Sequence, residues 1–120
     1  MKKILIVEDN PVIQQLIIFA LDLDGEYSWI TADDAVSGIT KIIQEKPDLL
    51  LLDLVLPGNP RPKELINAFQ SCSATPIVIV SAAAEQQTID ECMNEGVKAY
   101  ITKPFKPTNL LETIRQILQP

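Results

Sequence analysis

Polar side chains that could do chemistry follow the short apolar runs of this sequence. Glu8 and Asp9 follow the first run, Asp53 the third, Ser81 the fourth and Lys103 the fifth. Each of them alone has an ordinary explanation as a turn residue, a helix cap or solvated surface. Capping explains any one of these side chains but not the whole set with a lysine included. Their recurrence therefore favours a single functional site.

The chemistry of this set is that of oxygen ligands and one ammonium group. Three carboxylates that converge on one small site repel one another, so their ionised state needs a cation. The chain contains no histidine, and Cys72 and Cys92 have no metal-binding spacing. Ligands restricted to oxygen select a hard ion, and Mg²⁺ is the ion that we expect here.

A carboxylate beside Mg²⁺ is also equipped to accept a phosphoryl group. The Asp53 oxygen would attack in line, while the metal and Lys103 neutralise the charge of the transferred group and Ser81 contacts its oxygens. No general base is needed because a carboxylate is already ionised at neutral pH. This chemistry predicts a phosphorylation switch rather than a conventional turnover enzyme.

Short apolar runs must position these residues. Such runs, rich in β-branched residues and too short for helices, are typical of strands buried on both faces, as in parallel sheets. The expected strands are Ile4–Val7, Tyr27–Thr31, Leu49–Leu52, Ile77–Val80 and Val97–Ile101.

Helical patterns separate the predicted strands, each with a start or stop signal. The first follows the cap Asn10 and ends before Gly25, the fourth ends at Gly96, and the fifth begins at Pro107. The apolar positions at helical spacing are Val36, Ile39 and Ile43 in the second; Leu65, Ile66 and Phe69 in the third; Ile89 and Met93 in the fourth; Leu110, Leu111, Ile114, Ile117 and Leu118 in the fifth.

Five strand–helix repeats predict an α/β fold, a doubly wound parallel sheet with helices on both faces. Ligands of such folds bind outside the carboxyl ends of the strands. This is the edge at which the candidate site residues are expected.

Composition limits the classes of function. The net charge of −6 argues against direct nucleic-acid binding, which relies on lysine and arginine. The longest apolar run, residues 16–21, is far too short to cross a membrane, and nothing at the amino end resembles a signal peptide. We expect a cytoplasmic protein of one domain, residues 1–120, without an output domain in this chain.

Four segments together resemble the receiver domain of two-component response regulators, over essentially the whole chain. They are Ile4-Leu5-Ile6-Val7-Glu8-Asp9-Asn10, the run from Asp48 to Gly58, Ile79-Val80-Ser81-Ala82 and Lys103-Pro104-Phe105. Each is weak alone, but their order and spacing are specific. The resemblance implies a flavodoxin-like fold with strand order 2-1-3-4-5 and a cis peptide bond between Lys103 and Pro104.

The same resemblance implies roles for individual residues. Asp53 would be phosphorylated by a phosphohistidine of a histidine kinase or a histidine phosphotransfer protein. Mg²⁺ would be held by Asp9 and Asp53, by Glu8 through water and by the Val55 carbonyl. The implied readers of the phosphoryl state are Ser81 and Lys103, which would contact its oxygens, and Tyr100, which would be the switch aromatic.

Tyr100 is equally consistent with an ordinary half-buried strand residue. The signal would leave through a surface that contacts a downstream protein target or a second copy of the chain. On the first helix, Ile18 and Phe19 could belong to such a patch, although single exposed apolar residues are common.

Three other functions share part of this pattern. A phosphatase of the haloacid dehalogenase type needs a second aspartate two residues after the first, where this chain has Val55. A flavin-binding module would need a phosphate-binding loop where Glu8 and Asp9 would repel phosphate. The remaining alternative is a non-phosphorylated pseudo-receiver that serves as a protein-interaction module.

Overall fold

Strands and helices alternate along the chain. The structure, a computed structural model, describes residues 1–119. Its elements are β1 (Lys2–Val7), α1 (Pro11–Asp24), β2 (Tyr27–Ala32), α2 (Ala35–Glu45), β3 (Leu49–Leu52), α3 (Pro62–Gln70), β4 (Ile77–Ser81), α4 (Gln86–Asn94), β5 (Ala99–Thr102) and α5 (Pro107–Leu118). None of the helices in this range is long and apolar enough to cross a membrane.

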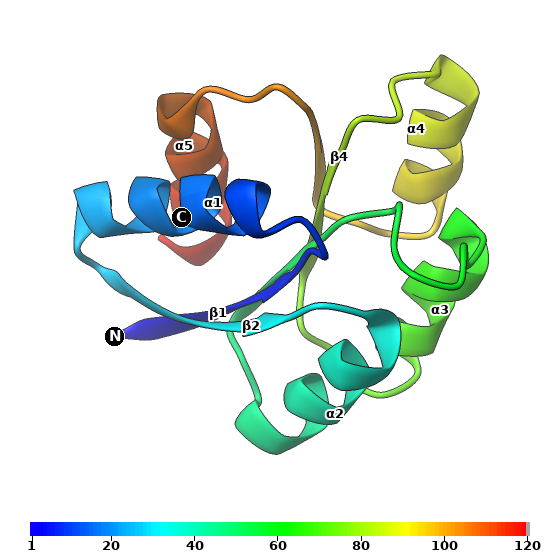
Figure 1. Cartoon of the computed structure of the whole chain (residues 1–120), viewed down its shortest axis with the longest axis horizontal. Helices are drawn as coiled ribbons and strands as arrows, with labels where there is room; N and C mark the ends of the chain where they lie inside the picture. The colour runs from blue at the N-terminus through cyan, green and yellow to red at the C-terminus, as the bar shows by residue number, and fades with distance from the viewer. Residues whose placement is uncertain (120) are drawn as a thin grey trace.

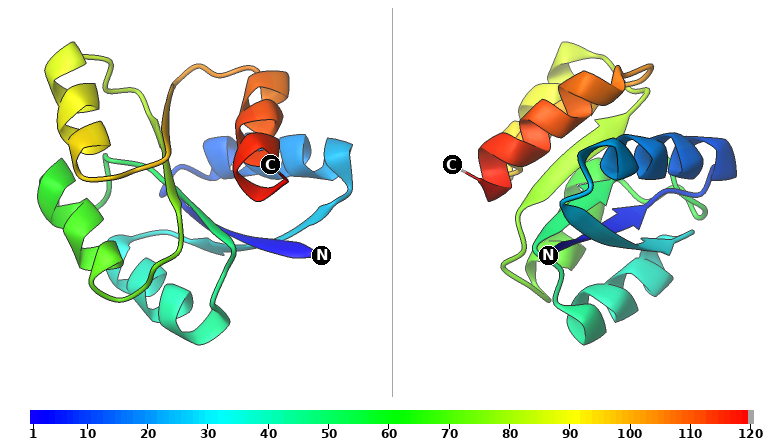
Figure 2. Two further views of the ribbon diagram at one scale, coloured as in Figure 1. Left: turned by 180° about the vertical axis from the view of Figure 1, so that it is seen from behind. Right: turned by 90° about the vertical axis from the view of Figure 1, so that its left-hand side faces the viewer.

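The five strands form one parallel sheet in the order β2-β1-β3-β4-β5. Helices α1 and α5 cover one face, and α2, α3 and α4 cover the other (Figures 1 and 2). The predicted doubly wound fold and its 2-1-3-4-5 order are therefore confirmed. The strand order reverses between β1 and β3, which is where such folds bind ligands.

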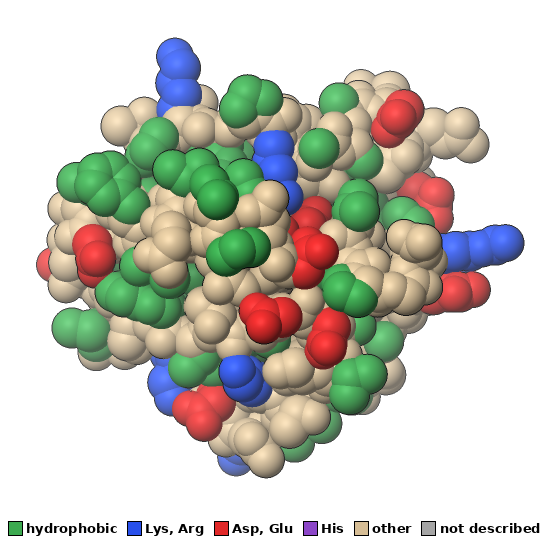
Figure 3. All heavy atoms as spheres, in the orientation of Figure 1, with side chains coloured by type: hydrophobic (Ala, Val, Ile, Leu, Met, Phe, Trp, Pro, Cys, Tyr) green, Lys and Arg blue, Asp and Glu red, His purple; other side chains and the backbone are tan. Residues whose placement is uncertain are grey.

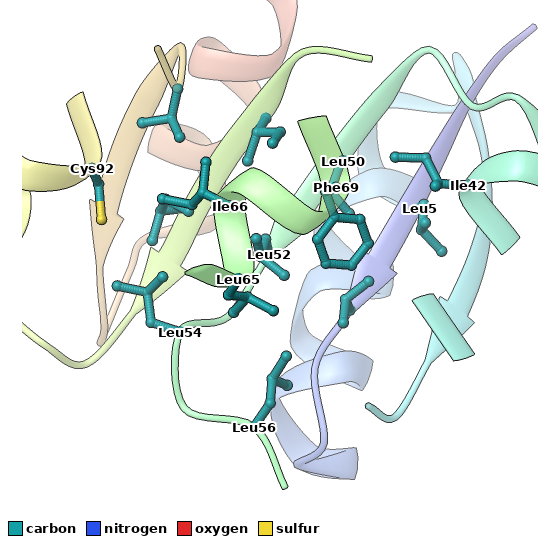
Figure 4. Packing of buried hydrophobic residues seen from close by; sticks show 14 of the residues in the cluster. Leu5, Ile42, Leu50, Leu52, Leu54, Leu56, Leu65, Ile66, Phe69 and Cys92 are labelled. Carbon is teal, nitrogen blue, oxygen red and sulfur yellow. The ribbon is translucent and has the colours of Figure 1, made fainter. Parts of the chain in front are cut away.

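Alternate residues of the central strands feed two separate cores. Leu5 and Leu50 point into the core under α2, α3 and α4, together with Phe69 of α3 (Figure 4). Ile4 and Leu49 point into the core under α1 and α5. Both faces of β1 and β3 are covered, which explains why their sequences are continuously apolar.

Of the three apolar positions that predict the buried face of α2, only Ile39 packs against the core. Val36 is 78% exposed and Ile43 52% exposed, whereas Ile42 and Gly38 are buried. A Cβ built on Gly38 would lie 2.9 Å from Cγ2 of Val7, so the missing side chain allows the helix to approach β1 closely.

The helix ends follow the predicted signals, whereas four of the five strands have bounds that differ from the prediction by one or two residues. The Asn10 side chain accepts hydrogen bonds from the backbone N–H groups of Val12 and Ile13 at the start of α1, and Gly25 ends that helix in the left-handed region. The fifth strand begins at Ala99 rather than Val97, because the chain leaves α4 through Gly96 at φ 94° before it joins the sheet. The peptide bond between Lys103 and Pro104 is cis, as the resemblance implies.

Candidate functional site

Backbone pairing brings the polar strand ends to one edge of the sheet. The N–H of Asp53 donates to the carbonyl of Val7 at 3.0 Å, so the loops after β1 and β3 begin side by side. The N–H of Lys103 donates to the carbonyl of Ser81 at 2.9 Å, which joins the ends of β4 and β5 in the same way. The site is thus built by the ends of parallel strands, as the sequence predicts.

Three carboxylates converge at this edge. One carboxylate oxygen each of Glu8, Asp9 and Asp53 lies within 4.8 Å of the others. Glu8 and Asp53 are buried, whereas Asp9 is exposed. Acidic side chains gather beside a basic one near the middle of the face shown in Figure 3. A cluster with two buried carboxylates and one open to solvent could hold a hard cation that enters from the solvent side.

Lys103 supplies the positive charge within this cluster. Its Nζ lies 2.6 Å from Oε1 of Glu8 and 3.4 Å from Oδ2 of Asp53. The lysine side chain is only 15% exposed, so both ion pairs are largely shielded from water. One ammonium group therefore lies between two buried carboxylates and offsets only one negative charge, and the third carboxylate, Asp9, is exposed.

Glu8 carries the clearest electrostatic perturbation in the site. The pKa of its carboxyl group is raised from 4.5 to about 7, chiefly by burial and to a smaller extent by the negative charge of Asp53, against the opposing effect of the hydrogen bonds from Lys103 and the Asn10 backbone. The Asn10 N–H donates to Oε2 of Glu8 at 3.1 Å. At neutral pH, without a metal ion, Glu8 is poised between its protonated and ionised forms.

Ser81 and Tyr100 meet at the loop that follows β4. The Ser81 side chain is fully buried, and its Oγ accepts a hydrogen bond from the N–H of Ala83 at 3.2 Å. The Tyr100 hydroxyl donates to the carbonyl of Ala83 at 2.6 Å, and burial raises the pKa of its phenol. A shift of this loop would therefore change the surroundings of both side chains.

Val55 lies in the loop after Asp53, where its N–H donates to Oδ1 of Asp53 at 3.2 Å. Its side chain is 59% exposed. This hydrogen bond leaves Oδ2 as the oxygen of Asp53 that faces Lys103.

Gln14 connects two loops at the candidate site, a role that its position in the sequence did not predict. Its Nε2 donates to the carbonyl of Glu8 at 2.5 Å and to Oδ1 of Asp33 at 2.8 Å, so it ties the loop after β1 to the loop after β2. The only sequence signal was the position of Asp33 just after a strand. A glutamine in the middle of a helix gives no such indication.

The arrangement has a specific chemical capacity. A carboxylate oxygen of Asp53 lies beside two further carboxylates that could hold a cation and 3.4 Å from the Lys103 ammonium. These are the groups that stabilise a phosphoryl group on an aspartate.

The chain is similar to known proteins over nearly its full length. The family model of the response regulator receiver domain matches residues 4–115. The transcriptional regulatory protein KdpE of Staphylococcus aureus is 42% identical over 118 residues, 96% of this chain and 49% of that protein. The phosphate regulon transcriptional regulatory protein PhoB of Pseudomonas aeruginosa is 34% identical over 121 residues, 98% of this chain and 52% of that protein. The chain thus spans about half the length of these curated relatives.

Solved structures agree with this similarity. A two-component response regulator from Clostridium difficile superposes with a TM-score of 0.91 at 27% identity, over 99% of this chain and 97% of that one. A CheY-like receiver domain protein from Methanospirillum hungatei superposes with a TM-score of 0.85 at 32% identity, over 97% of this chain and 92% of that one.

Proposed function

Because the chain belongs to the response regulator receiver domain family, we propose that it is a phosphoacceptor switch of a two-component phosphorelay, phosphorylated on Asp53. The observation that carries this proposal is the placement of Asp53. Its carboxylate is buried beside Glu8 and Asp9, and its Oδ2 lies 3.4 Å from the Lys103 ammonium. The cluster of acids is intact, which favours a phosphorylated receiver over the pseudo-receiver alternative.

The reaction forms an acyl phosphate. Oδ2 of Asp53 attacks the phosphorus atom of a phosphohistidine on a histidine kinase or a histidine phosphotransfer protein. The P–N bond breaks, and its electron pair stays on the imidazole nitrogen of the donor. Lys103 then faces the new phosphoryl oxygens instead of a carboxylate oxygen, and the Ser81 hydroxyl is the neutral group nearest to them along the sheet edge.

A hard cation fits the donor set of this site. Glu8, Asp9 and Asp53 provide carboxylate oxygens within 4.8 Å of one another, and the carbonyl of Val55 is the fourth ligand that we assign. When bound, Mg²⁺ would neutralise charge on the transferred group. Binding of this ion requires ionised Glu8, which ties metal affinity to the raised pKa of that group.

The output of the switch follows from the contacts of Ser81 and Tyr100. Movement of Ser81 toward a phosphoryl group would carry the loop around Ala83 with it and release or redirect the Tyr100 hydroxyl. The surface of β5 and its neighbouring helices would change as a result, and a downstream protein target or a second copy of the chain would read it. We place this function in the cytoplasm, with residues 1–120 acting as the receiver unit and without direct nucleic-acid contact of their own.

Small-molecule phosphorylation tests the proposal. The purified protein is treated with acetyl phosphate and Mg²⁺, and the adduct is followed by intact mass and located by borohydride reduction and peptide mapping. We expect one phosphoryl group, on Asp53, that disappears in Asp53→Asn and in wild-type protein treated with EDTA. The exposed Asp90→Asn is the matched control and retains the adduct.

The pseudo-receiver alternative makes the opposite prediction. In that case neither acetyl phosphate nor a phosphohistidine donor labels the wild-type protein. An adduct that survives in Asp53→Asn would also contradict the assignment, because it would place the phosphoryl group elsewhere.

A further inference from the structure

Gln14 belongs to α1, the helix that follows the loop with the candidate metal ligands Glu8 and Asp9. Its backbone N–H donates to the carbonyl of Asn10 at 3.0 Å, so the first turn of the helix fixes the point from which its side chain extends. Gln14 is partly buried, whereas Gln15 next to it is exposed. The two glutamines therefore have different surroundings, although they are neighbours on one helix.

The side-chain amide of Gln14 holds two loops at once. Its Nε2 donates to the carbonyl of Glu8 at 2.5 Å and to Oδ1 of Asp33, in the loop after β2, at 2.8 Å. A primary amide has two N–H donors, so both are used. The N–H of Glu8 in turn donates to the carbonyl of Ala32 at 3.0 Å. The backbone of Glu8 is therefore held on both sides, through its N–H by the end of β2 and through its carbonyl by Gln14.

The carbonyl that Gln14 binds belongs to the peptide group between Glu8 and Asp9. A peptide group is planar and includes the Cα atom of the residue that follows it. The hydrogen bond from Gln14 consequently restrains Cα of Asp9 as well, and with it the direction in which the aspartate side chain leaves the backbone.

Asp9 depends on this restraint more than the other two carboxylates do. Glu8 and Asp53 are buried, and both pair with Lys103. Asp9 is exposed and takes part in no ion pair within residues 1–119. One of its oxygens nevertheless lies within 4.8 Å of a carboxylate oxygen of each of the other two. The backbone that carries Asp9 therefore has to set its position.

We propose that Gln14 is a positioning residue for the metal site, and that Asp33 is the anchor that keeps its amide in place. Gln14 does not bind the ion. It holds the peptide group before Asp9, so that this carboxylate lies close to the other two before the ion binds. The inference rests on the proposed function, because the ion is the Mg²⁺ that we assign to these carboxylates.

The size of the effect follows from the kind of contact. Partners that orient a metal ligand through a hydrogen bond contribute about ten- to hundredfold to metal affinity. Because Gln14 contacts the backbone of the ligand rather than its carboxylate, we expect the lower end of this range.

Calorimetric titration of the unphosphorylated protein with Mg²⁺ alone tests the proposal. In Gln14→Met the side chain keeps a similar length and helix propensity but has no N–H donor. We expect this variant to bind Mg²⁺ about tenfold more weakly than the wild type. Gln15→Met, on the same helix, is the matched control and should leave Mg²⁺ affinity unchanged. Circular dichroism verifies that each variant is folded.

Two variants of Asp33 separate its hydrogen bond from its charge. Asp33→Ala removes both and should weaken Mg²⁺ binding less than Gln14→Met does, because the bond to the Glu8 carbonyl remains. Asp33→Asn removes only the charge, since its amide oxygen can still accept from Gln14, and should bind Mg²⁺ more tightly than Asp33→Ala. In the Gln14→Met background the two Asp33 variants should have equal affinities, because the donor is gone.

The rate of phosphorylation by acetyl phosphate separates positioning from a general loss of structure. Gln14→Met should raise the Mg²⁺ concentration at half-maximal rate about tenfold, and saturating Mg²⁺ should restore most of the rate. A disordered site would stay slow at saturating Mg²⁺, and that result would contradict a positioning role.

Other outcomes would also overturn the proposal. Equal Mg²⁺ affinities of the wild type and Gln14→Met, or equal losses in Gln14→Met and Gln15→Met, leave Gln14 without this role. Equal affinities of Asp33→Ala and Asp33→Asn would remove Asp33 as its anchor. Failure of the proposed function is a separate result: a wild type that binds Mg²⁺ without being phosphorylated on Asp53 contradicts the phosphoacceptor assignment, whereas the Mg²⁺ affinities of the variants still decide the role of Gln14.

Discussion

Lys103 pairs more closely with Glu8 than with Asp53. Its Nζ lies 2.6 Å from Oε1 of Glu8, compared with 3.4 Å from Oδ2 of the aspartate. The shorter ion pair of Lys103 is therefore formed with Glu8, a residue that is expected to hold the metal ion. A cation that binds Glu8 would compete with Lys103 for that carboxylate and free the ammonium group to face the phosphoryl oxygens. Metal binding and readiness for phosphorylation would thus be coupled through a single ion pair.

The raised pKa of Glu8 predicts the pH dependence of stability in the absence of metal. The pKa is about 7 in the folded protein, compared with an ordinary value of 4.5, so between these pH values the folded state binds more protons than the unfolded chain. The stability contributed by protonated Glu8 is complete below about pH 4.5 and is lost as the pH rises through about 7. The loss should amount to a few kcal/mol at most and is measured by urea unfolding from pH 5 to pH 8 in EDTA.

Glu8→Gln provides the control for this prediction. Because glutamine does not titrate, the difference in unfolding free energy between the wild type and the variant should change across that window. Added Mg²⁺ should stabilise the wild type increasingly above pH 7, where Glu8 is ionised. Parallel pH profiles for the two proteins would contradict the assignment to Glu8.

Removal of the shared cation should perturb both buried carboxylates. In Lys103→Met the hydrogen bond and charge that lower the pKa of Glu8 are gone, so this pKa should rise further. We expect a loss of about 1–3 kcal/mol in unfolding free energy at pH 7, less than for a charge that cannot neutralise itself by taking up a proton. Carbon NMR of labelled glutamate follows the titration. Lys106→Met, at an exposed lysine three residues further on, should change neither quantity.

The hydroxyl of Tyr100 should stabilise the loop after β4. Tyr100→Phe removes the hydrogen bond to the carbonyl of Ala83 and should lower the unfolding free energy by about 1 kcal/mol. Phosphorylation by acetyl phosphate should persist, because the hydroxyl does not contact Asp53. Tyr27→Phe is the matched control, since the Tyr27 hydroxyl accepts a longer hydrogen bond, 3.3 Å, from Gln119. Equal losses of unfolding free energy in the two variants would contradict a specific contribution of the hydrogen bond to Ala83.

The sequence predicted which residues lie at the candidate site better than it predicted the contacts between their side chains. Asp53 and Lys103 could be placed at one edge because parallel strands align their carboxyl ends. The preference of Lys103 for Glu8 depends on side-chain rotamers, which strand order does not determine. The link from Gln14 to the loop after β1 was unpredictable for the same reason. In α2 the apolar spacing was right for Ile39 but wrong for Val36 and Ile43, because the close packing of this helix depends on a side chain that Gly38 lacks.

The substitution Gly38→Ala tests whether tight packing outweighs the gain in helix propensity at this position. Alanine favours a helix interior over glycine by about 1 kcal/mol, so the exchange would stabilise an exposed position. Here the new Cβ would lie 2.9 Å from Cγ2 of Val7 and 3.0 Å from Cζ of Phe69, both buried between α2 and the sheet. Relief of such contacts in a packed core costs about 1–3 kcal/mol, so we expect a net loss of about 1–2 kcal/mol in urea unfolding.

Two comparisons separate overpacking from other effects of that substitution. Thr40→Ala, at an exposed position of the same helix, should leave stability unchanged or raise it slightly. Phe69→Leu removes one of the two close neighbours, so the effect of Gly38→Ala should be smaller in that background. The same loss in both backgrounds would mean that Phe69 is not the obstacle. Because Val7 directly precedes Glu8, a displacement of β1 should also weaken Mg²⁺ binding by Gly38→Ala, whereas Thr40→Ala should not affect it.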